Sequence, residues 1–388
     1  MSSRNSKKRE IYQIALTGGP CAGKSTFVSS CKRLLDERGI KTITIPEVAT
    51  EIMASSIMYG DIPHLAFQTI VLSKMLLNEK NALIAAECYK EQGQDVVIFY
   101  DRGICDNKAY CSAEDWQKLL KSKGLSDEKL RHRYDAVFNI VTTAYGAENV
   151  WEMLHGNNPQ RYERTVAQAQ ETEDRTQAAW AGHHNLKIFG NDKSGWEGKE
   201  KRMFDAVFAI IGVVPQIRMS NRYLTDLPSD LESFASKYHC VMQHIEQTYL
   251  KTGKSGAERR IRRIQNGRNA KDIAYYYTER EKAEKGVFTH REYMLRSERE
   301  YGRLLAQADP SKNTIIKTRY AFTADNQHLA LDVYPEDRHP QLRGKALLEL
   351  KEIEKAGQDI IAPKELHNVQ DVTDDNRYAI VSLAMKNK

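Results

Sequence analysis

The chain lacks the cysteine spacings and the long apolar runs that mark several classes of protein. Its 388 residues include six cysteines, with no Cys-x-x-Cys pair and no histidine cluster beside them. Metal centres of cysteine and histidine and disulfide frameworks are built on such spacings, so both are excluded and reduced thiols are expected. No apolar run approaches the roughly 20 residues that a membrane-spanning helix requires. The sequence therefore predicts a cytoplasmic protein and leaves peripheral association with a membrane surface open.

Length and composition indicate two domains. Apolar residues make up 41% of the chain and charged residues 28%, which is typical of soluble proteins. A chain of 388 residues exceeds the usual size of a single hydrophobic core. Residues 1–10 are polar and basic, and we expect a disordered arm there rather than a secretory signal. The sequence changes character near Val213, so the expected domains span residues 11–213 and 214–388.

A glycine-rich motif follows the first apolar run. Residues 18–25 have the spacing Gly-x4-Gly-Lys-Ser, between an apolar run at 14–16 and a helical pattern at 26–38. A strand, a glycine turn and a helix start direct successive backbone N–H groups toward an anion. We expect Lys24 to neutralise the β- and γ-phosphates of a nucleoside triphosphate and Ser25 to ligate Mg²⁺. The predicted nucleotide-binding residues are Gly18, Gly19, Gly23, Lys24, Ser25 and Thr26, and the predicted cofactors are GTP or ATP with Mg²⁺.

The first half of the chain alternates apolar strands with helical patterns. Strands are predicted at 12–17, 42–46, 96–100, 137–142 and 186–190. Helices are predicted at 24–38, 64–92, 113–123, 126–133, 171–181 and 197–212. This alternation is typical of a parallel sheet with helices on both faces, so we predict an α/β P-loop domain.

Charged residues follow two of these predicted strands. Ligands bind at the carboxyl edge of a parallel sheet, so we expect Asp101 to hold Mg²⁺ through water and Arg102 to contact phosphate. Glu47 either positions a hydroxyl or a water, acts as a general base, or is a surface acid that caps a helix. The predicted catalytic residues are Lys24, Asp101, Arg102 and Glu47, with Ser25 and Asp101 as metal ligands.

Several motifs of the first half resemble known families. The segments at 18–26, 46–50 and 101–103 are similar to the P-loop domain of bacterial nicotinamide riboside and nucleoside kinases. Residues 133–135, 144–148 and 179–183 resemble the amino-terminal domain of the TRP translocation defect protein family of insects. This likeness spans most of residues 11–212.

The kinase resemblance implies a mobile lid that supplies arginines to the transferred phosphoryl group. The polar stretch 156–175 is the expected lid, with Arg161, Arg164 and Arg175 as candidates. Trp180 and the histidine pair 183–184 either contact a nucleobase or belong to the core.

The second half contains strand-like stretches in which charged and apolar residues alternate. They lie at 216–224, 245–250, 258–265, 273–279, 314–322, 328–334, 346–354 and 378–384. Arg260 and Arg262 share one strand face, and Lys317 and Arg319 share another. Charge on the inner face of a sheet is costly unless the sheet curls around water and an anion. We therefore predict a mainly antiparallel α+β barrel with a polar lumen.

A series of short motifs lies at 247–250, 258–263, 276–278, 316–320, 331–333, 348–350, 372–373 and 377–378. In their order and spacing over about 170 residues, they are similar to the CYTH and triphosphate-tunnel superfamily. The resemblance implies a tunnel that holds a triphosphate and its metal. The Glu-x-Glu-x-Lys motif of catalytic members corresponds to residues 218–222, where Arg218 and Ser220 replace the two acids. Without these metal-binding carboxylates, hydrolysis is disfavoured and anion binding is retained. The predicted tunnel residues are Arg260, Arg262, Lys317, Arg319, Glu349 and Arg377.

Four functions remain open at this stage. The two-domain resemblance to the TRP translocation defect protein family implies a nucleotide-regulated protein that binds GTP in its first domain and a phosphoinositide or polyphosphate in its second. The motif at 101–103 favours a small-molecule kinase, and an active triphosphatase is a weaker alternative. The basic run 251–271 is either a solvated face or a polyanion site, and no recognised motif supports nucleic acid as a partner.

Overall fold

The computed structural model describes residues 10–155, 163–214, 220–252, 257–267, 272–282, 288–351 and 359–386. The chain divides into two units by its internal contacts. Unit 1 comprises Met1–Gly124, Arg133–Ala179 and Phe189–Ile211; unit 2 comprises Leu125–His132, Trp180–Ile188 and Gly212–Lys388. Two short segments of the first half, 125–132 and 180–188, thus belong to unit 2, which the sequence pattern did not indicate.

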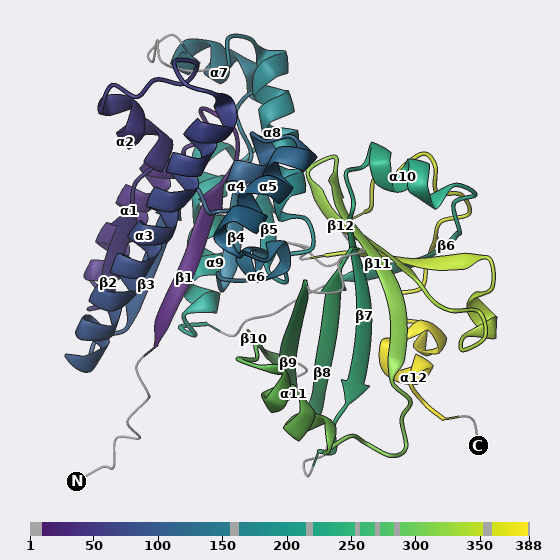
Figure 1. Ribbon diagram of the computed structural model, residues 1–388. Helices are drawn as coiled ribbons and strands as arrows, with labels where there is room; N and C mark the ends of the chain where they lie inside the picture. The colour runs from purple at the N-terminus through teal and green to yellow at the C-terminus, as the bar shows by residue number, and fades with distance from the viewer. Residues whose placement is uncertain are drawn as a thin grey trace. The chain divides into compact units, whose positions relative to one another are not determined.

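Unit 1 is built on the predicted parallel sheet (Figure 1). Its strand order is β2-β3-β1-β4-β5. The strands are β1 (Ile11–Thr17), β2 (Lys41–Ile45), β3 (Val96–Asp101), β4 (Ala136–Ile140) and β5 (Leu186–Phe189), and all of β5 except Phe189 is counted with unit 2. Every residue of β4 and all but the last of β3 are buried, because both faces of the central strands are covered.

Helices cover this sheet on both faces. The helices of the first 211 residues are α1 (Lys24–Asp36), α2 (Val48–Ala54), α3 (His64–Glu91), α4 (Asp106–Ala109), α5 (Ala113–Lys123), α6 (Asp127–Arg131), α7 (Glu148–His155), α8 (Val166–Trp180) and α9 (Gly195–Ile210). On one face α1 and α9 pack against the sheet. On the other, Glu79 of α3 accepts a hydrogen bond from Tyr134, whose ring packs against Tyr100 of β3.

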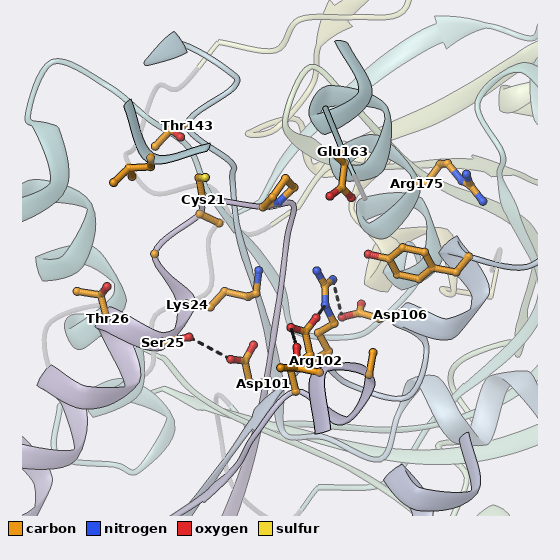
Figure 2. A pocket seen from close by; sticks show the side chains of 18 of the residues that line it. Cys21, Lys24, Ser25, Thr26, Asp101, Arg102, Asp106, Thr143, Glu163 and Arg175 are labelled. Carbon is orange, nitrogen blue, oxygen red and sulfur yellow. Dashed lines mark hydrogen bonds and ion pairs between the residues drawn. The ribbon is translucent and has the colours of Figure 1, made fainter. Parts of the chain in front are cut away.

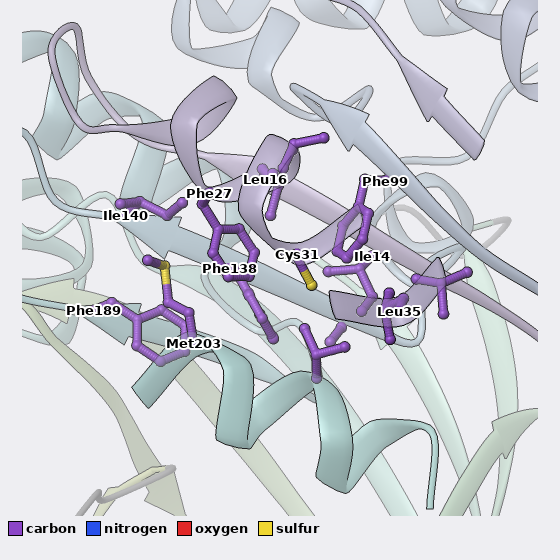
Figure 3. Packing of buried hydrophobic residues seen from close by; sticks show 14 of the residues in the cluster. Ile14, Leu16, Phe27, Cys31, Leu35, Phe99, Phe138, Ile140, Phe189 and Met203 are labelled. Atoms are coloured by element: carbon purple, nitrogen blue, oxygen red, sulfur yellow. The ribbon is translucent and has the colours of Figure 1, made fainter. Parts of the chain in front are cut away.

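The core between the sheet and these two helices is rich in aromatic rings (Figure 3). The ring of Phe27, on α1, lies 6.1 Å from that of Phe99 and 6.4 Å from that of Phe138. Met203 of α9 is fully buried in the same cluster. Truncating a fully buried phenylalanine to alanine costs about 3–5 kcal/mol, so Phe27 fixes the first turn of α1 firmly against the sheet.

Unit 2 contains an antiparallel sheet of nine strands, so the predicted fold class is confirmed. The order is β10-β9-β8-β7-β11-β12-β13-β6-β14, and the sheet bends strongly (Figure 1). The strands are β6 (Asn221–Asp226), β7 (Val241–Tyr249), β8 (Ala257–Asn266), β9 (Ile273–Lys282), β10 (Phe288–Met294), β11 (Ile315–Ala324), β12 (Gln327–Val333), β13 (Lys345–Leu350) and β14 (Gln370–Asp371).

The strand register places a line of charge on one face of this sheet. Arg319 of β11 lies opposite Asp332 of β12. Glu349 of β13 lies opposite Arg222 of β6, and Arg262 of β8 opposite Gln247 of β7. Directly paired residues point to the same face, so these side chains gather on one side. We call this side the charged face.

The other face of the sheet is apolar over β11, β12 and β13. Phe322, Leu331 and Leu348 are buried there against Phe234 of α10 (Leu231–Lys237). Separating charged from apolar side chains in this way follows directly from the period of two along each strand. This apolar part supplies one hydrophobic core, and the charged face combines its ion pairs with smaller apolar clusters around Ile245 and Ile315.

One predicted strand is wrong. Residues 378–384 do not extend the sheet but follow the 3₁₀ turn Asn376–Tyr378 and form the helix α12 (Ile380–Leu383). Helical spacing lets Leu383 and Ala384 pack together into a cluster with Tyr249 and Ile315. The alternation that suggested a strand cannot be told from a helical pattern over so few residues.

Several elements of unit 2 were not predicted. They are α10, α11 (Glu298–Leu305), β10, β14 and the 3₁₀ turn Pro340–Leu342. Residues 1–9 of the expected arm lie outside the described residues. Residues 215–219, which include Arg218, also lie outside them. Among the described helices, none combines the length and the apolar character needed to cross a membrane.

Candidate functional site

The glycine-rich motif forms a loop between β1 and α1, at the carboxyl edge of the parallel sheet. We call residues 18–26 the phosphate loop. Leu16 of β1 pairs with Asp101 of β3, so the end of β3 lies beside the start of the loop. Arg102 follows at a positive φ of 74°, a conformation uncommon for residues other than glycine. The sheet therefore brings two segments 75 residues or more apart in sequence to one place.

Two glycines of the loop have positions that no larger residue fits. Gly18 has a φ of 123°, and a Cβ there would lie 2.1 Å from the carbonyl oxygen of Ile140. Gly23 has a φ of 90°, and its Cβ would lie 2.3 Å from the ring of Trp196. Both the backbone angle and the space thus require glycine. Trp196 lies close to the loop from α9, a contact that the motif itself did not reveal.

A buried glutamate supports the loop from α8. Oε2 of Glu173 accepts hydrogen bonds from the N–H groups of Gly19, at 2.7 Å, and Thr142, at 2.8 Å. Its other oxygen accepts from Gln177 at 3.0 Å. A carboxylate that bridges two backbone N–H groups holds the entry of the loop against the end of β4. Glu173 carries no motif in sequence, and only its placement reveals this role.

The side chain of Lys24 lies over the phosphate loop (Figure 2). Its Nζ donates to the carbonyl oxygens of Gly18 and Gly19, at 3.0 Å each. An ammonium group has three N–H donors, so one remains for a phosphate oxygen. Burial and the neighbouring Arg102 lower the pKa of Lys24, while Asp101, Glu47 and Glu173 oppose that shift. A bound polyphosphate would favour the charged form strongly in such a buried position.

Ser25 and Asp101 have the donors that Mg²⁺ prefers. The Ser25 hydroxyl donates to Oδ2 of Asp101 at 3.3 Å (Figure 2). The other carboxylate oxygen of Asp101, Oδ1, is buried without a hydrogen-bond partner among the described residues. A buried oxygen of this kind needs a cation or a water to replace its lost hydration. Hydroxyl and carboxylate oxygens fit a magnesium site at this edge of the sheet.

Glu47 and Arg102 form an ion pair inside the same cavity. Nε of Arg102 donates to Oε1 of Glu47 at 2.5 Å, and its guanidinium lies 3.7 Å from Asp106. Burial alone would raise the pKa of Glu47, but Arg102, Lys24 and a hydrogen bond from Thr50 lower it to about 2. Glu47 is therefore an ionised acceptor, suited to orient a hydroxyl or a water and poorly suited to remove its proton.

These groups line a cavity of about 1140 Å³ in unit 1. The phosphate loop and Asp101 form one wall, and Glu163 lies across from Arg102 (Figure 2). A further part of the lining, from α2, α3 and the loop between them, is mostly apolar and consists of Met53, Met58, Tyr59, Phe67, Gln68, Val71 and Met75. We call this part the apolar arm. Sites for a single small ligand usually measure about 300–1,000 Å³, so the cavity has room for more than one.

Two of the three arginines predicted for the lid line the cavity. Arg161 lies outside the described residues, whereas Arg164 and Arg175 both line the cavity. Of the two alternatives for Trp180 and the histidine pair 183–184, nucleobase contact or a place in the core, burial favours the core. Trp180 is fully buried, and none of these three residues lines the cavity, because their segment belongs to unit 2.

The charged face of unit 2 holds a second group of predicted residues. Asp332 accepts two hydrogen bonds from Arg319, at 2.7 Å each, and one from Lys317 at 2.5 Å. Arg319 also donates to Glu349 at 2.7 Å. All four side chains are at most 10% exposed. Lys317 and Arg319, which the sequence assigned to an anion, are thus already neutralised by two acids of the same sheet.

Three arginines nearby are less completely paired. Arg222, Arg260 and Arg262 each have a buried Nε without a hydrogen-bond partner within the described part of the chain. Arg262 contacts Glu292 at 2.5 Å and Arg260 contacts Glu258 at 3.0 Å. Burial lowers the pKa of Arg262, and the nearby Arg260 and Arg319 add to this effect despite Glu292. Positive charge is therefore in local excess, as an anion site requires.

Arg377 does not belong to this group, so its assignment to the tunnel is wrong. Its side chain is 81% exposed and donates to Asp375 through both Nε and a terminal nitrogen. It lies on the 3₁₀ turn that precedes α12, and not on a strand.

A family model matches part of the first half of the chain. Residues 13–197 match the family model of the AAA domain. No match was found among curated proteins.

Two solved structures are similar to part of this chain. The hypothetical protein NE1496 is 22% identical, with a TM-score of 0.29, and the match covers 44% of this chain and 99% of that chain. The inorganic triphosphatase NE1496 is 21% identical, with a TM-score of 0.29, covering 45% of this chain and 99% of that chain.

Proposed function

We propose that the protein binds GTP or ATP with Mg²⁺ in the cavity of unit 1, hydrolyses it slowly, and holds a phosphorylated anion on the charged face of unit 2. The observation that carries the first part is the convergence of Lys24, Ser25 and Asp101 on one cavity. A P-loop domain at residues 13–197 supports the same assignment. The second part depends on the unpaired arginine nitrogens of the charged face.

In this proposal the triphosphate lies along the phosphate loop. The first turn of α1 directs its free N–H groups and its positive dipole end at the phosphates. Lys24 donates its third N–H to a phosphate oxygen. Mg²⁺, held by Ser25 and Asp101, neutralises charge on the phosphate oxygens when it is bound. Arg164 and Arg175 face the same cavity and supply further positive charge to the nucleotide.

Slow hydrolysis follows from the character of Glu47. Attack by water is helped most by a base whose pKa lies near the working pH. The pKa of Glu47 is lowered to about 2, so it accepts a hydrogen bond from water and removes a proton poorly. The protein therefore keeps its nucleotide bound for longer than an efficient hydrolase would.

Substitution of the loop lysine tests this proposal. We expect Lys24→Ala to weaken Mg²⁺-GTP or Mg²⁺-ATP binding at least about 100-fold, since a buried, hydrogen-bonded charge is removed from the phosphate site. Isothermal titration calorimetry measures the change. Lys32→Ala, on the exposed side of α1 where Lys32 pairs with Asp36, is the matched control and should bind as the wild type does. Equal affinity of the wild type and Lys24→Ala would refute the nucleotide site.

A small-molecule kinase is the second candidate. The apolar arm favours it, because a triphosphate alone leaves that arm unfilled. In this case Glu47 would orient the hydroxyl of a nucleoside-like acceptor toward the terminal phosphate. A panel of nucleosides, each incubated with Mg²⁺-ATP and Mg²⁺-GTP, decides between the two. Nucleoside-dependent formation of diphosphate would support the kinase, and a slow rate that no nucleoside changes would support the binding protein.

Two arginines on the opposite face of β8 provide a matched control for the proposed anion site of unit 2. Arg260 and Arg262 point to the charged face, whereas Arg259 and Arg263 point to the other face of the same strand and pair with Glu279 and Glu246. We expect Arg260→Gln with Arg262→Gln to weaken binding of tripolyphosphate and of phosphoinositide vesicles about tenfold or more. The Arg259→Gln/Arg263→Gln pair should leave both unchanged. Equal losses in the two double variants would mean that the anion is held only by general surface charge.

A further inference from the structure

Three histidines from distant parts of the sequence meet inside unit 2. His132 follows α6, and His183 and His184 lie between α8 and β5. One ring nitrogen from each lies within 4.8 Å of those of the other two. His132 and His183 are buried, and His184 is partly buried. Histidine, cysteine, aspartate and glutamate are the usual metal ligands. Among the described residues, no other three side chains of these types bring their ligand atoms so close together.

The geometry of the closest pair suits a metal ion. Nδ1 of His132 lies 3.0 Å from Nδ1 of His184. Two imidazole nitrogens bound to a tetrahedral zinc ion at about 2.0–2.1 Å lie roughly 3.3 Å apart. The pair thus needs a shift of only about 0.3 Å, and the third nitrogen must approach by roughly 1.5 Å at most. Rotation of the His183 or His184 ring provides such a movement.

A carboxylate lies behind the first histidine. Nε2 of His132 is 3.2 Å from Oε1 of Glu128, one helical turn earlier on α6. Metal-binding histidines commonly direct their second ring nitrogen to a carboxylate, which fixes the tautomer. With its proton on Nε2, His132 presents the lone pair of Nδ1 toward His184.

The surroundings of the three histidines are rich in carboxylates. Asp127 and Glu128 both pair with the fully buried Arg131, and Asp272 accepts a hydrogen bond from Ser126. Two carboxylates thus share one guanidinium, which leaves a net negative charge for a cation to offset. The ring of Tyr276 lies 5.0 Å from that of His132, and its hydroxyl is buried without a hydrogen-bond partner within the described residues.

We propose that His132, His183 and His184 form a binding site for Zn²⁺ that ties the segments 125–132 and 180–188 together within unit 2. Imidazole ligands favour borderline transition metals such as zinc over Mg²⁺ or Ca²⁺, which prefer oxygen. Three histidines leave one position of a tetrahedral zinc ion for water or another ligand. This site is separate from the nucleotide cavity, and none of its three histidines lines that cavity.

Zinc titration of the full-length protein tests the proposal. After metal is removed with a chelator, Zn²⁺ is added in competition with a chromophoric indicator. We expect one tight site per chain in the wild type and an affinity more than about 100-fold lower in His184→Gln. Glu128→Gln, which alters the partner of His132, should lower the affinity by about 10- to 100-fold. His367→Gln, at an exposed histidine of the same unit, is the matched control and should bind as the wild type does.

Cobalt distinguishes this site from adventitious binding to the six cysteines. Co²⁺ bound by imidazole alone gives the visible bands of tetrahedral cobalt without the intense near-ultraviolet band of a thiolate ligand. The proposal predicts the first spectrum in the wild type and its loss in His184→Gln. A thiolate band, or equal zinc affinity in the wild type and His184→Gln, would overturn it. In that case the 3.0 Å contact is a hydrogen bond between two imidazoles that share one proton.

Discussion

The cavity of unit 1 and the charged face of unit 2 use similar side chains in opposite ways. In the cavity, Lys24 keeps a donor for a ligand and Asp101 has a buried oxygen without a partner. On the charged face, Lys317 and Arg319 donate hydrogen bonds to Asp332, and Arg319 also donates to Glu349. The first arrangement is completed by a ligand, and the second is largely complete without one.

This difference shows that a basic residue on the charged face is not by that position alone a ligand-binding residue. Burying a charge costs several kcal/mol unless a partner compensates it. Where the chain supplies the partner, the charge stabilises and orders the fold. Arg222, Arg260 and Arg262 are intermediate, because each has an acidic partner and also a buried Nε without a hydrogen-bond partner within the described residues.

The largest effect should come from breaking the compensated group. Asp332→Asn removes the carboxylate that neutralises Lys317 and Arg319, so we expect unit 2 to lose about 3–5 kcal/mol of stability. Hydrogen exchange of the amides in β11 and β12 reports this loss for unit 2 alone. Glu336→Gln is the control, because Glu336 pairs with Arg343 at the surface and should contribute less than about 1 kcal/mol. Equal protection in both variants would mean that the buried pair adds nothing.

A smaller effect should follow from distorting the phosphate loop. Gly23→Ala puts a Cβ against Trp196 at a backbone angle that favours glycine. We expect nucleotide affinity to fall about 10- to 100-fold, at a cost of roughly 1–3 kcal/mol for the strained residue. Calorimetry measures the affinity. Gly39→Ala, also at a positive φ but with open space around its Cβ, is the control that separates crowding at the site from general backbone strain. Unchanged affinity in Gly23→Ala would show that the loop adapts.

The smallest effect is a pH dependence of unit 2. Burial and the neighbouring Arg319 lower the pKa of Lys317 to about 7, although Asp332 and Glu349 oppose the shift. The unfolded chain, with a lysine pKa of about 10.4, holds a proton between pH 7 and 10 that the folded chain has lost. Stability should therefore rise with pH in this window, by about 1–2 kcal/mol between pH 7 and pH 9.

Lys317→Met provides the comparison for this pH dependence. Without the titrating amine, the rise in amide protection of β11 between pH 7 and pH 9 should disappear. If the slope is the same in the variant and the wild type, another group causes it. In the cavity of unit 1, by contrast, the ionised Glu47 should hold its charge across the whole of this range.

The sequence predicted the α/β part closely because its signals are local. Apolar runs such as Val96–Asp101 form strands, and the residues at 18–25 carry a spacing that one loop geometry requires. The second half was predicted less completely. The helix at 380–383 was taken for a strand, and Arg377 was placed in a tunnel from which the structure separates it. Short segments carry too few turns to show their period.

Sequence also misjudged which side chains act together. Glu173 and Trp196 support the phosphate loop from helices about 150 or more residues away, without any motif. His132 and His184, which we propose as zinc ligands, meet at 3.0 Å across 52 residues. Pattern analysis detects groups that are close in sequence, and these side chains become close only on folding.

The sequence by itself determined the phosphate loop, the parallel sheet and the alternation that gives unit 2 a charged face. Each depends on neighbouring residues, whose spacing fixes backbone geometry and side-chain direction. The tertiary structure decided which charges are paired, which are left for a ligand, and which segments belong to each unit. These outcomes depend on contacts between distant residues and on the loss of water around them, which no local pattern records.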